Sequence, residues 1–199
     1  MKILCYGDSN TWGYNPEKLH IRYSKSCRYP MVLQKLLGKE HVVIEEGLCS
    51  RTIANDDPFH LSSAYNGSKH FENCFKSNLP LDAVVLFLGS NDMKDYFNFD
   101  SYAAAKALDE LYIAKIRQIS PNSKIIIVIP KEIESTTIAG FENAKEKSKD
   151  FEIAYETIAN KYNLDYISND IIEIGSDGLH LSKKAHRNLA YKLYEILKN

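Results

Sequence analysis

Two stretches of this chain are continuously apolar after one charged residue: DAVVLFL at 82–88 and KIIIVI at 124–129. A strand with one face in solvent alternates apolar and polar residues, whereas these runs have no polar face. They therefore predict strands that are covered on both sides, as in a parallel sheet. Weaker runs predict three more strands, at 2–6, 41–46 and 164–168.

Helical patterns separate these runs. Pro30 suits the first turn of one helix and Gly38 its end. Asp100 or Ser101 is a candidate N-cap for a second helix, and Ser182 for the last. Apolar residues at helical spacing mark four buried faces: Val32, Leu33, Leu36 and Leu37; Ala105, Leu108, Tyr112, Ile116 and Ile119; Phe151, Tyr155, Ile158 and Tyr162; Ala185, Leu189, Leu193 and Ile196. Strand–helix alternation of this kind predicts a doubly wound α/β sheet of five parallel strands.

The whole chain, residues 1–199, is predicted to form one domain. Its length suits a single core, and no repeat or low-complexity linker divides it. Two long irregular segments, at about 50–80 and 131–142, follow the second and fourth predicted strands. Both should emerge at the carboxyl edge of the sheet, where open α/β sheets bind their ligands.

Charge and composition exclude several classes of function. The formal net charge of -1 argues against a nucleic-acid or anionic-membrane partner. No apolar run approaches the roughly 20 residues of a membrane span, and no secretory leader is expected. The 4 cysteines form no C-x-x-C pair, which argues against a zinc site or a redox motif. We expect no metal and no cofactor, and reduced thiols in a cytoplasmic protein.

Polar residues of chemical interest follow four of the predicted strands. The segments are GDSN at 7–10, EGLCSRT at 46–52, LGSND at 88–92 and SDGLHLS at 176–182. The carboxyl ends of parallel strands meet at one edge of a sheet. A serine, an asparagine and an Asp-x-x-His sequence are therefore predicted to meet at one rim.

Ser9, Asp177 and His180 suit nucleophilic catalysis. A serine hydroxyl is a weak nucleophile until a base removes its proton, and His180 is the candidate base. Asp177 lies three residues earlier and can orient the imidazole through Nδ1, so that one short loop carries both groups. Attack on an ester carbonyl also creates an oxyanion, which needs hydrogen-bond donors.

The four blocks GDSN, GLCSRT, GSND and DGLH resemble, in order, those of the SGNH hydrolases, the GDSL-type esterases. ILCYGDSNTWGYNP and LPLDAVVLFLGSNDMKDYF are similar to the bacterial arylesterase/acyltransferase branch. The resemblance implies a three-layer α/β/α, flavodoxin-like fold. It also implies a serine esterase that hydrolyses short-chain aryl, alkyl or acetyl esters through an acyl-Ser9 intermediate. Water or an alcohol would accept the acyl group, and a homo-oligomer is implied.

The resemblance further implies three oxyanion donors. They are the backbone N–H of Ser9, a backbone N–H in the second block and the side-chain amide of Asn91. Alignment on CSRT puts Ser50 at the second position, where many relatives carry glycine, and Gly47 is the competing candidate. The first block departs from Gly-Asp-Ser-Leu at Asn10, a side chain with no part in the reaction.

Several residues have two interpretations. Trp12 is a candidate substrate-binding wall or a packing residue. Arg51 is predicted to form an ion pair with Asp56 or Asp57. His60 lies in the long loop without a partner pattern.

Two other classes of function are weighed against the esterase. One is a non-catalytic flavodoxin-like binding module, although GDSNTWG lacks a G-x-G-x-x-G pattern and a P-loop lysine. The other is a metal-dependent hydrolase that uses Asp8, Asp92, Asp177 and His180.

Overall fold

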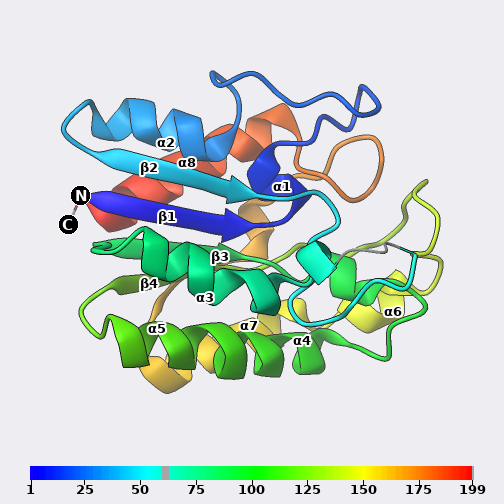
Figure 1. Cartoon of the computed structure of the whole chain (residues 1–199). Helices are drawn as coiled ribbons and strands as arrows, with labels where there is room; N and C mark the ends of the chain where they lie inside the picture. The colour runs from blue at the N-terminus through cyan, green and yellow to red at the C-terminus, as the bar shows by residue number, and fades with distance from the viewer. Residues whose placement is uncertain (60–62, 199) are drawn as a thin grey trace.

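The structure is a computed structural model that describes residues 1–59 and 63–198. Five parallel strands form one sheet in the order β2-β1-β3-β4-β5 (Figure 1). They are β1 (Lys2–Gly7), β2 (Val42–Gly47), β3 (Ala83–Phe87), β4 (Lys124–Val128) and β5 (Asp165–Ile167). The five strands and the flavodoxin-like order confirm the predicted fold class.

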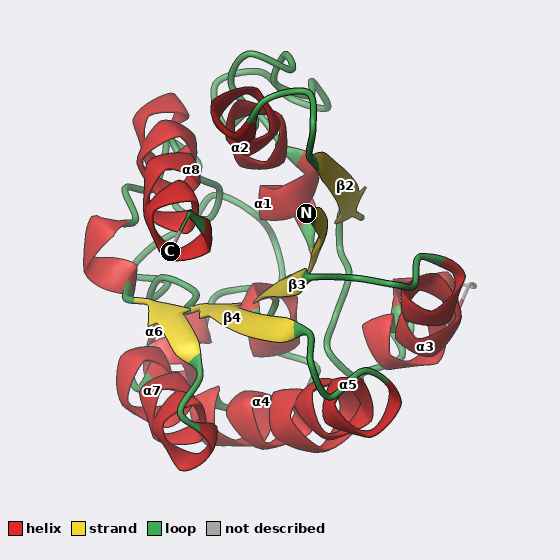
Figure 2. Ribbon diagram, turned by 90° about the vertical axis from the view of Figure 1, so that its left-hand side faces the viewer, coloured by secondary structure: helices red, strands yellow, loops and turns green. Residues whose placement is uncertain are grey.

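Helices cover both faces of the sheet, and two apolar clusters fill the two interfaces (Figure 2). One face carries α2 (Tyr29–Leu37) and α8 (Lys183–Leu197). The other face carries α3 (Gly67–Ser77), α4 (Ser101–Leu108), α5 (Ala114–Ile119) and α7 (Phe151–Tyr162). Successive strand residues serve opposite faces: Leu4 and Tyr6 pack in one cluster, whereas Ile3 and Cys5 pack in the other.

The predicted helix ends agree with the structure. Gly38 ends α2, and Asp100 Oδ1 accepts a hydrogen bond of 2.8 Å from Ala103 N at the start of α4. Ser182 Oγ accepts one of 3.1 Å from Ala185 N at the start of α8. A π-helical turn, η3 (Asp109–Ile113), joins α4 to α5, so the predicted second helix is almost continuous.

The expectation of an irregular chain over 50–80 is wrong for α3 and for the 3-10 turn η1 (Ser63–Tyr65). The α3 sequence is mostly polar and buries only a narrow stripe, chiefly Phe71, Cys74 and Phe75. That stripe has the i, i+3, i+4 spacing of a helix, and Asn66 Oδ1 caps it through Ser68 N at 3.2 Å. Residues 131–142 are irregular, as predicted, and the short α6 (Ala144–Ser148) follows them.

Within the part of the chain that the structure describes, no helix has both the length and the apolar character needed to cross a bilayer.

Candidate active site

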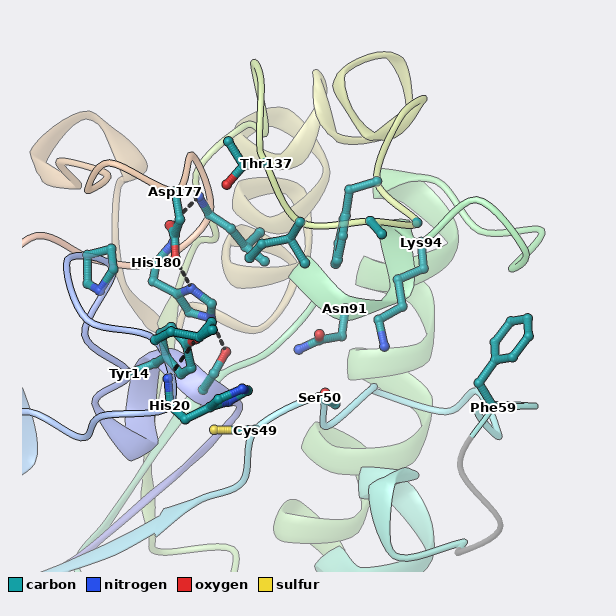
Figure 3. Close-up of a pocket in the computed structure, with 18 of the residues that line it drawn as sticks. Tyr14, His20, Cys49, Ser50, Phe59, Asn91, Lys94, Thr137, Asp177 and His180 are labelled. Carbon is teal, nitrogen blue, oxygen red and sulfur yellow. Dashed lines mark hydrogen bonds and ion pairs between the residues drawn. The ribbon is translucent and has the colours of Figure 1, made fainter.

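Three side chains form a hydrogen-bonded chain at the carboxyl edge of the sheet (Figure 3). Ser9 Oγ lies 2.9 Å from His180 Nε2, and His180 Nδ1 lies 2.5 Å from Asp177 Oδ2. Ser9 opens the one-turn helix α1 (Ser9–Trp12) directly after β1, whereas Asp177 and His180 come from the loop before α8. The structure thus brings together the three residues that the sequence predicts for catalysis.

The turn that carries the serine is tied to the loop that carries the histidine. Asp8 Oδ1 accepts a hydrogen bond of 2.8 Å from Asn10 N, which caps the one-turn helix. Asn10 Oδ1 in turn accepts one of 2.9 Å from Leu181 N. An added Cβ at Gly7 would lie 2.0 Å from Thr11 Oγ1, so the tight turn excludes a side chain there. The asparagine after the serine therefore has a structural task that leucine could not perform.

Asp177 is held as a hydrogen-bond acceptor. Its Oδ1 accepts from Leu179 N at 3.0 Å and from His180 N at 2.9 Å. Burial by itself would raise the pKa of Asp177, but the hydrogen bonds from His180 and from these backbone amides hold the pKa below 3.8. The carboxylate is therefore ionised at neutral pH. The ionised carboxylate accepts a hydrogen bond from His180 Nδ1–H. This leaves His180 Nε2 unprotonated and able to accept the serine proton.

An aromatic ring covers the imidazole. Tyr14 stacks on His180 with 4.2 Å between ring centroids and an interplanar angle of 26°. Sequence reasoning missed Tyr14, although it lies in the stretch ILCYGDSNTWGYNP that carries the resemblance. Trp12, the predicted wall, instead packs under Arg22, whose guanidinium carbon is 5.1 Å from the indole centroid. Among the described residues that line the cavity, Tyr14 is present and Trp12 is not.

Two of the candidate oxyanion donors, Asn91 and Ser50, line the same cavity as Ser9. Figure 3 shows Asn91 and Ser50 opposite His180. Asn91 Nδ2 donates one hydrogen bond, of 3.1 Å, to the Arg51 carbonyl, and an amide has a second N–H to offer. Ser50 lines the cavity with a left-handed backbone, φ 64°, a conformation that glycine adopts most readily. An added Cβ at Gly47 would meet Trp12 N at 2.1 Å, so its lack of a side chain serves packing against α1.

Arg51 braces the strand ends beneath the site. Its side chain is only 2% exposed, and Nη1 donates to the Gly7 carbonyl at 2.9 Å and to the Glu46 carbonyl at 2.6 Å. Its Nη2 donates to Glu46 Oε1 at 3.2 Å, and the guanidinium lies 4.2 Å from the centroid of the Tyr6 ring. Arg51 thus links β1, β2 and, through its own carbonyl, the Asn91 amide.

The predicted ion pair of Arg51 with Asp56 or Asp57 is wrong. Asp56 pairs with Lys69 at 2.6 Å, and Asp57 pairs with Lys94 at 2.7 Å. The arginine side chain turns inward to carbonyl groups, which a sequence pattern cannot show. The Asp57–Lys94 pair is buried and places the lysine at the cavity wall.

A cavity of about 880 Å³ opens beside the three side chains. Its apolar lining includes Leu19, Phe59, Tyr96, Ile138 and Phe141. Residues from the long segments 50–80 and 131–142 contribute to this wall, as their position after the second and fourth strands predicts. His60 lies outside the described residues.

Two buried carboxyl groups lie behind the site. Burial raises the pKa of Asp8 to about 6 and that of Asp92 to about 7. Asp92 accepts hydrogen bonds from Ile53 N at 2.8 Å and from Asn55 Nδ2 at 2.9 Å, so it braces the segment directly after the second block.

Among the described residues, the side chains of Asp8, Asp92, Asp177 and His180 do not converge on a metal position. Over residues 1–59 and 63–198, one group of His, Cys, Asp and Glu ligand atoms is close enough to hold an ion, namely Glu46, His70 and Cys74. None of the four residues considered for a metal-dependent hydrolase belongs to this group. The geometry therefore supports the serine-based interpretation.

The chain belongs to the GDSL-like lipase/acylhydrolase family, whose model matches residues 5–187. This family consists of ester hydrolases, and the match confirms the class that the four sequence blocks predict. A comparison with curated proteins gave no match.

Solved structures of esterases share this fold over their whole length. An aryl esterase from M. smegmatis is 27% identical, with a TM-score of 0.87 over 99% of this chain and 98% of that one. A carbohydrate acetylesterase from Sinorhizobium meliloti is also 27% identical, with a TM-score of 0.88 and the same coverage. A carbohydrate acetylesterase family member from the same organism is 30% identical, with a TM-score of 0.88 over 99% of this chain and 97% of that one.

Proposed function

We propose that the protein is a serine esterase that hydrolyses short-chain carboxylic esters through an acyl-Ser9 intermediate. The observation that carries this proposal is the hydrogen-bonded chain Ser9–His180–Asp177 at the wall of the cavity. His180 Nε2 takes the proton from Ser9 Oγ as the oxygen attacks the ester carbonyl. Asp177 accepts a hydrogen bond from His180 Nδ1–H and stabilises the imidazolium that forms.

Three donors would stabilise the oxyanion of the tetrahedral intermediate. They are the backbone N–H groups of Ser9 and Ser50 and the side-chain amide of Asn91. Support for Ser50 rather than Gly47 comes from its position in the cavity lining and from its glycine-like backbone. An Asn amide donates without adding a titrating charge.

Collapse of the intermediate breaks the ester C–O bond, and His180 returns its proton to the departing alcohol. Water then attacks the acyl-Ser9 carbonyl with His180 again as base, which releases the acid and restores the hydroxyl. An alcohol in place of water would give a new ester. A cavity of about 880 Å³ leaves room for such an acceptor beside a short acyl group.

The substrate class that we propose is aryl, alkyl or acetyl esters with short acyl groups. The mostly apolar cavity wall supports it, as do solved relatives described as an aryl esterase and a carbohydrate acetylesterase. Tyr14 is the aromatic wall nearest the base. We assign Trp12 a supporting role behind it, with ring centroids 6.4 Å apart.

We also propose that residues 1–199 act as one domain, because both apolar clusters pack on the same sheet. The exposed side chains of Leu19 and Phe59 at the cavity, 76% and 75% accessible, suit a homo-oligomer contact. Four free cysteines among the described residues fit a cytoplasmic location. Light scattering after gel filtration tests the oligomer.

Hydrolysis of p-nitrophenyl acetate, butyrate and octanoate tests the activity. We expect the acetate or butyrate to give the highest kcat/KM and Ser9→Ala to reduce turnover to background. Ser63→Ala, the same change at an exposed serine, should retain activity. Turnover in the Ser9→Ala variant would refute the proposal.

A further inference from the structure

We propose that Glu46, His70 and Cys74 form a binding site for a single transition-metal ion of the Zn²⁺ or Co²⁺ type. The site lies between β2 and α3, and its residues are distinct from the hydrogen-bonded residues Ser9, His180 and Asp177. It is therefore additional to the proposed esterase reaction.

The three side chains converge from two elements. His70 and Cys74 stand four residues apart on α3 and so share one face of the helix. Glu46 lies near the end of β2, paired in register with Tyr6 of β1. One ligand atom from each of the three residues lies within 4.8 Å of the other two.

The ligand types select the metal. An imidazole nitrogen, a thiolate sulfur and a carboxylate oxygen are a set that Zn²⁺ accepts, whereas Mg²⁺ and Ca²⁺ take oxygen ligands. A Zn–S distance of about 2.3 Å and a Zn–N distance of about 2.0 Å require the ligand atoms to close by roughly 1 Å. Cys74 is buried and fixed, while His70 is exposed and the Glu46 side chain is 31% exposed, so the latter two can make that movement.

A second contact orients the histidine. The Tyr6 hydroxyl lies 3.4 Å from His70 Nδ1, and the two rings stack with an interplanar angle of 17°. A metal ion bound at Nε2 leaves this contact in place. An outer hydrogen bond of this kind is what usually fixes the tautomer of a metal-binding histidine.

Binding rearranges one existing ion pair. Arg51 Nη2 donates to Glu46 Oε1, and the metal ion competes for that carboxylate. Arg51 keeps its two bonds to the Gly7 and Glu46 carbonyls, so the brace beneath the serine turn survives. The Cys74 thiol gives up its proton to solvent as the metal–sulfur bond forms. With three protein ligands, the fourth position is left for water, and the affinity is lower than that of a closed four-ligand site.

Titration with Co²⁺ and with Zn²⁺ tests the site on the intact protein. Co²⁺ bound to a thiolate gives a charge-transfer absorption in the near ultraviolet, and a chromogenic chelator reports Zn²⁺ affinity by competition. We expect one equivalent of metal to bind. His70→Ala, at an exposed position that should not disturb folding, and Cys74→Ser should each weaken binding about tenfold or more, and Cys74→Ser should abolish the thiolate band.

Cys49→Ser and His41→Ala are the matched controls, because they remove a cysteine and a histidine elsewhere in the chain. Both should bind metal as the unmodified protein does, and Ser9→Ala should as well. Absence of binding would overturn the proposal. So would binding that His70→Ala and Cys74→Ser leave unchanged, since the metal would then be held elsewhere.

Discussion

Replacement of Asp177 by Asn tests how the carboxylate directs the histidine. Asn keeps an oxygen that can accept from Leu179 N and His180 N, which now bond Asp177 Oδ1 at 3.0 and 2.9 Å. It places an amide group where Oδ2 lies 2.5 Å from His180 Nδ1. Two N–H groups cannot face each other at that distance. The imidazole then favours the tautomer that carries its proton on Nε2.

That tautomer cannot accept the Ser9 proton, so the loss falls on the chemical step. In a well-studied Ser-His-Asp triad, the change of this Asp to Asn produces the wrong tautomer and costs about 10⁴ in kcat. We expect a loss of that order, or roughly 5 kcal/mol of transition-state stabilisation. KM should change little, because Asp177 acts on Ser9 only through the imidazole that lies between them. The melting temperature should fall only slightly, because the backbone hydrogen bonds remain.

Steady-state kinetics with p-nitrophenyl acetate, together with thermal unfolding, measures both effects. Asp170→Asn makes the same chemical change at an exposed carboxyl group and is expected to leave kcat unaltered. A folded Asp177→Asn protein with less than about a tenfold loss in kcat would refute the reasoning, because another group would then be orienting His180.

Three further substitutions probe the supports of the site. Ser50→Gly relieves a left-handed φ of 64° that costs a non-glycine residue about 1 kcal/mol, so kcat/KM should hold within about twofold and stability should not fall. A large loss of activity would instead mean that the Ser50 hydroxyl takes part. In Arg51→Lys, the lysine cannot bond several acceptors in one plane as arginine does, so the free energy of unfolding measured in urea should fall by about 2–3 kcal/mol. A free energy of unfolding equal to that of the unmodified protein would contradict the bracing role. Asp8→Asn removes a carboxyl group whose pKa rises from 3.8 to about 6 on burial. In the unmodified protein, Asp8 therefore binds its proton more tightly in the folded state than in the unfolded state. The unmodified protein should therefore lose up to about 3 kcal/mol relative to Asp8→Asn as the pH rises from about 4 to 7. A pH-independent difference would show that Asp8 does not titrate in this way.

The fold could be predicted from sequence because its strongest signals are local. The continuous apolar runs became β3 and β4, and capping residues such as Asp100 and Ser182 marked helix starts. The prediction failed at α3, whose polar sequence hides a three-residue buried stripe. Helix formation there depends on packing against the sheet, which the segment itself does not reveal.

The candidate site also has one part that could be predicted from the sequence and another that could not. Sheet topology alone implies that residues after parallel strands meet at one rim, which is why Ser9, Asn91 and His180 could be placed together in advance. The inward turn of Arg51 and the stacking of Tyr14 on His180 could not, because both depend on side-chain directions set by tertiary packing.

The most direct test of the central claim is mass spectrometry of the protein after reaction with a fluorophosphonate. We expect a single adduct per chain, mapped by peptide analysis to Ser9, and no adduct in the Ser9→Ala variant. An adduct on any other residue, or equal labelling of Ser9→Ala, would contradict the assignment of Ser9 as the nucleophile.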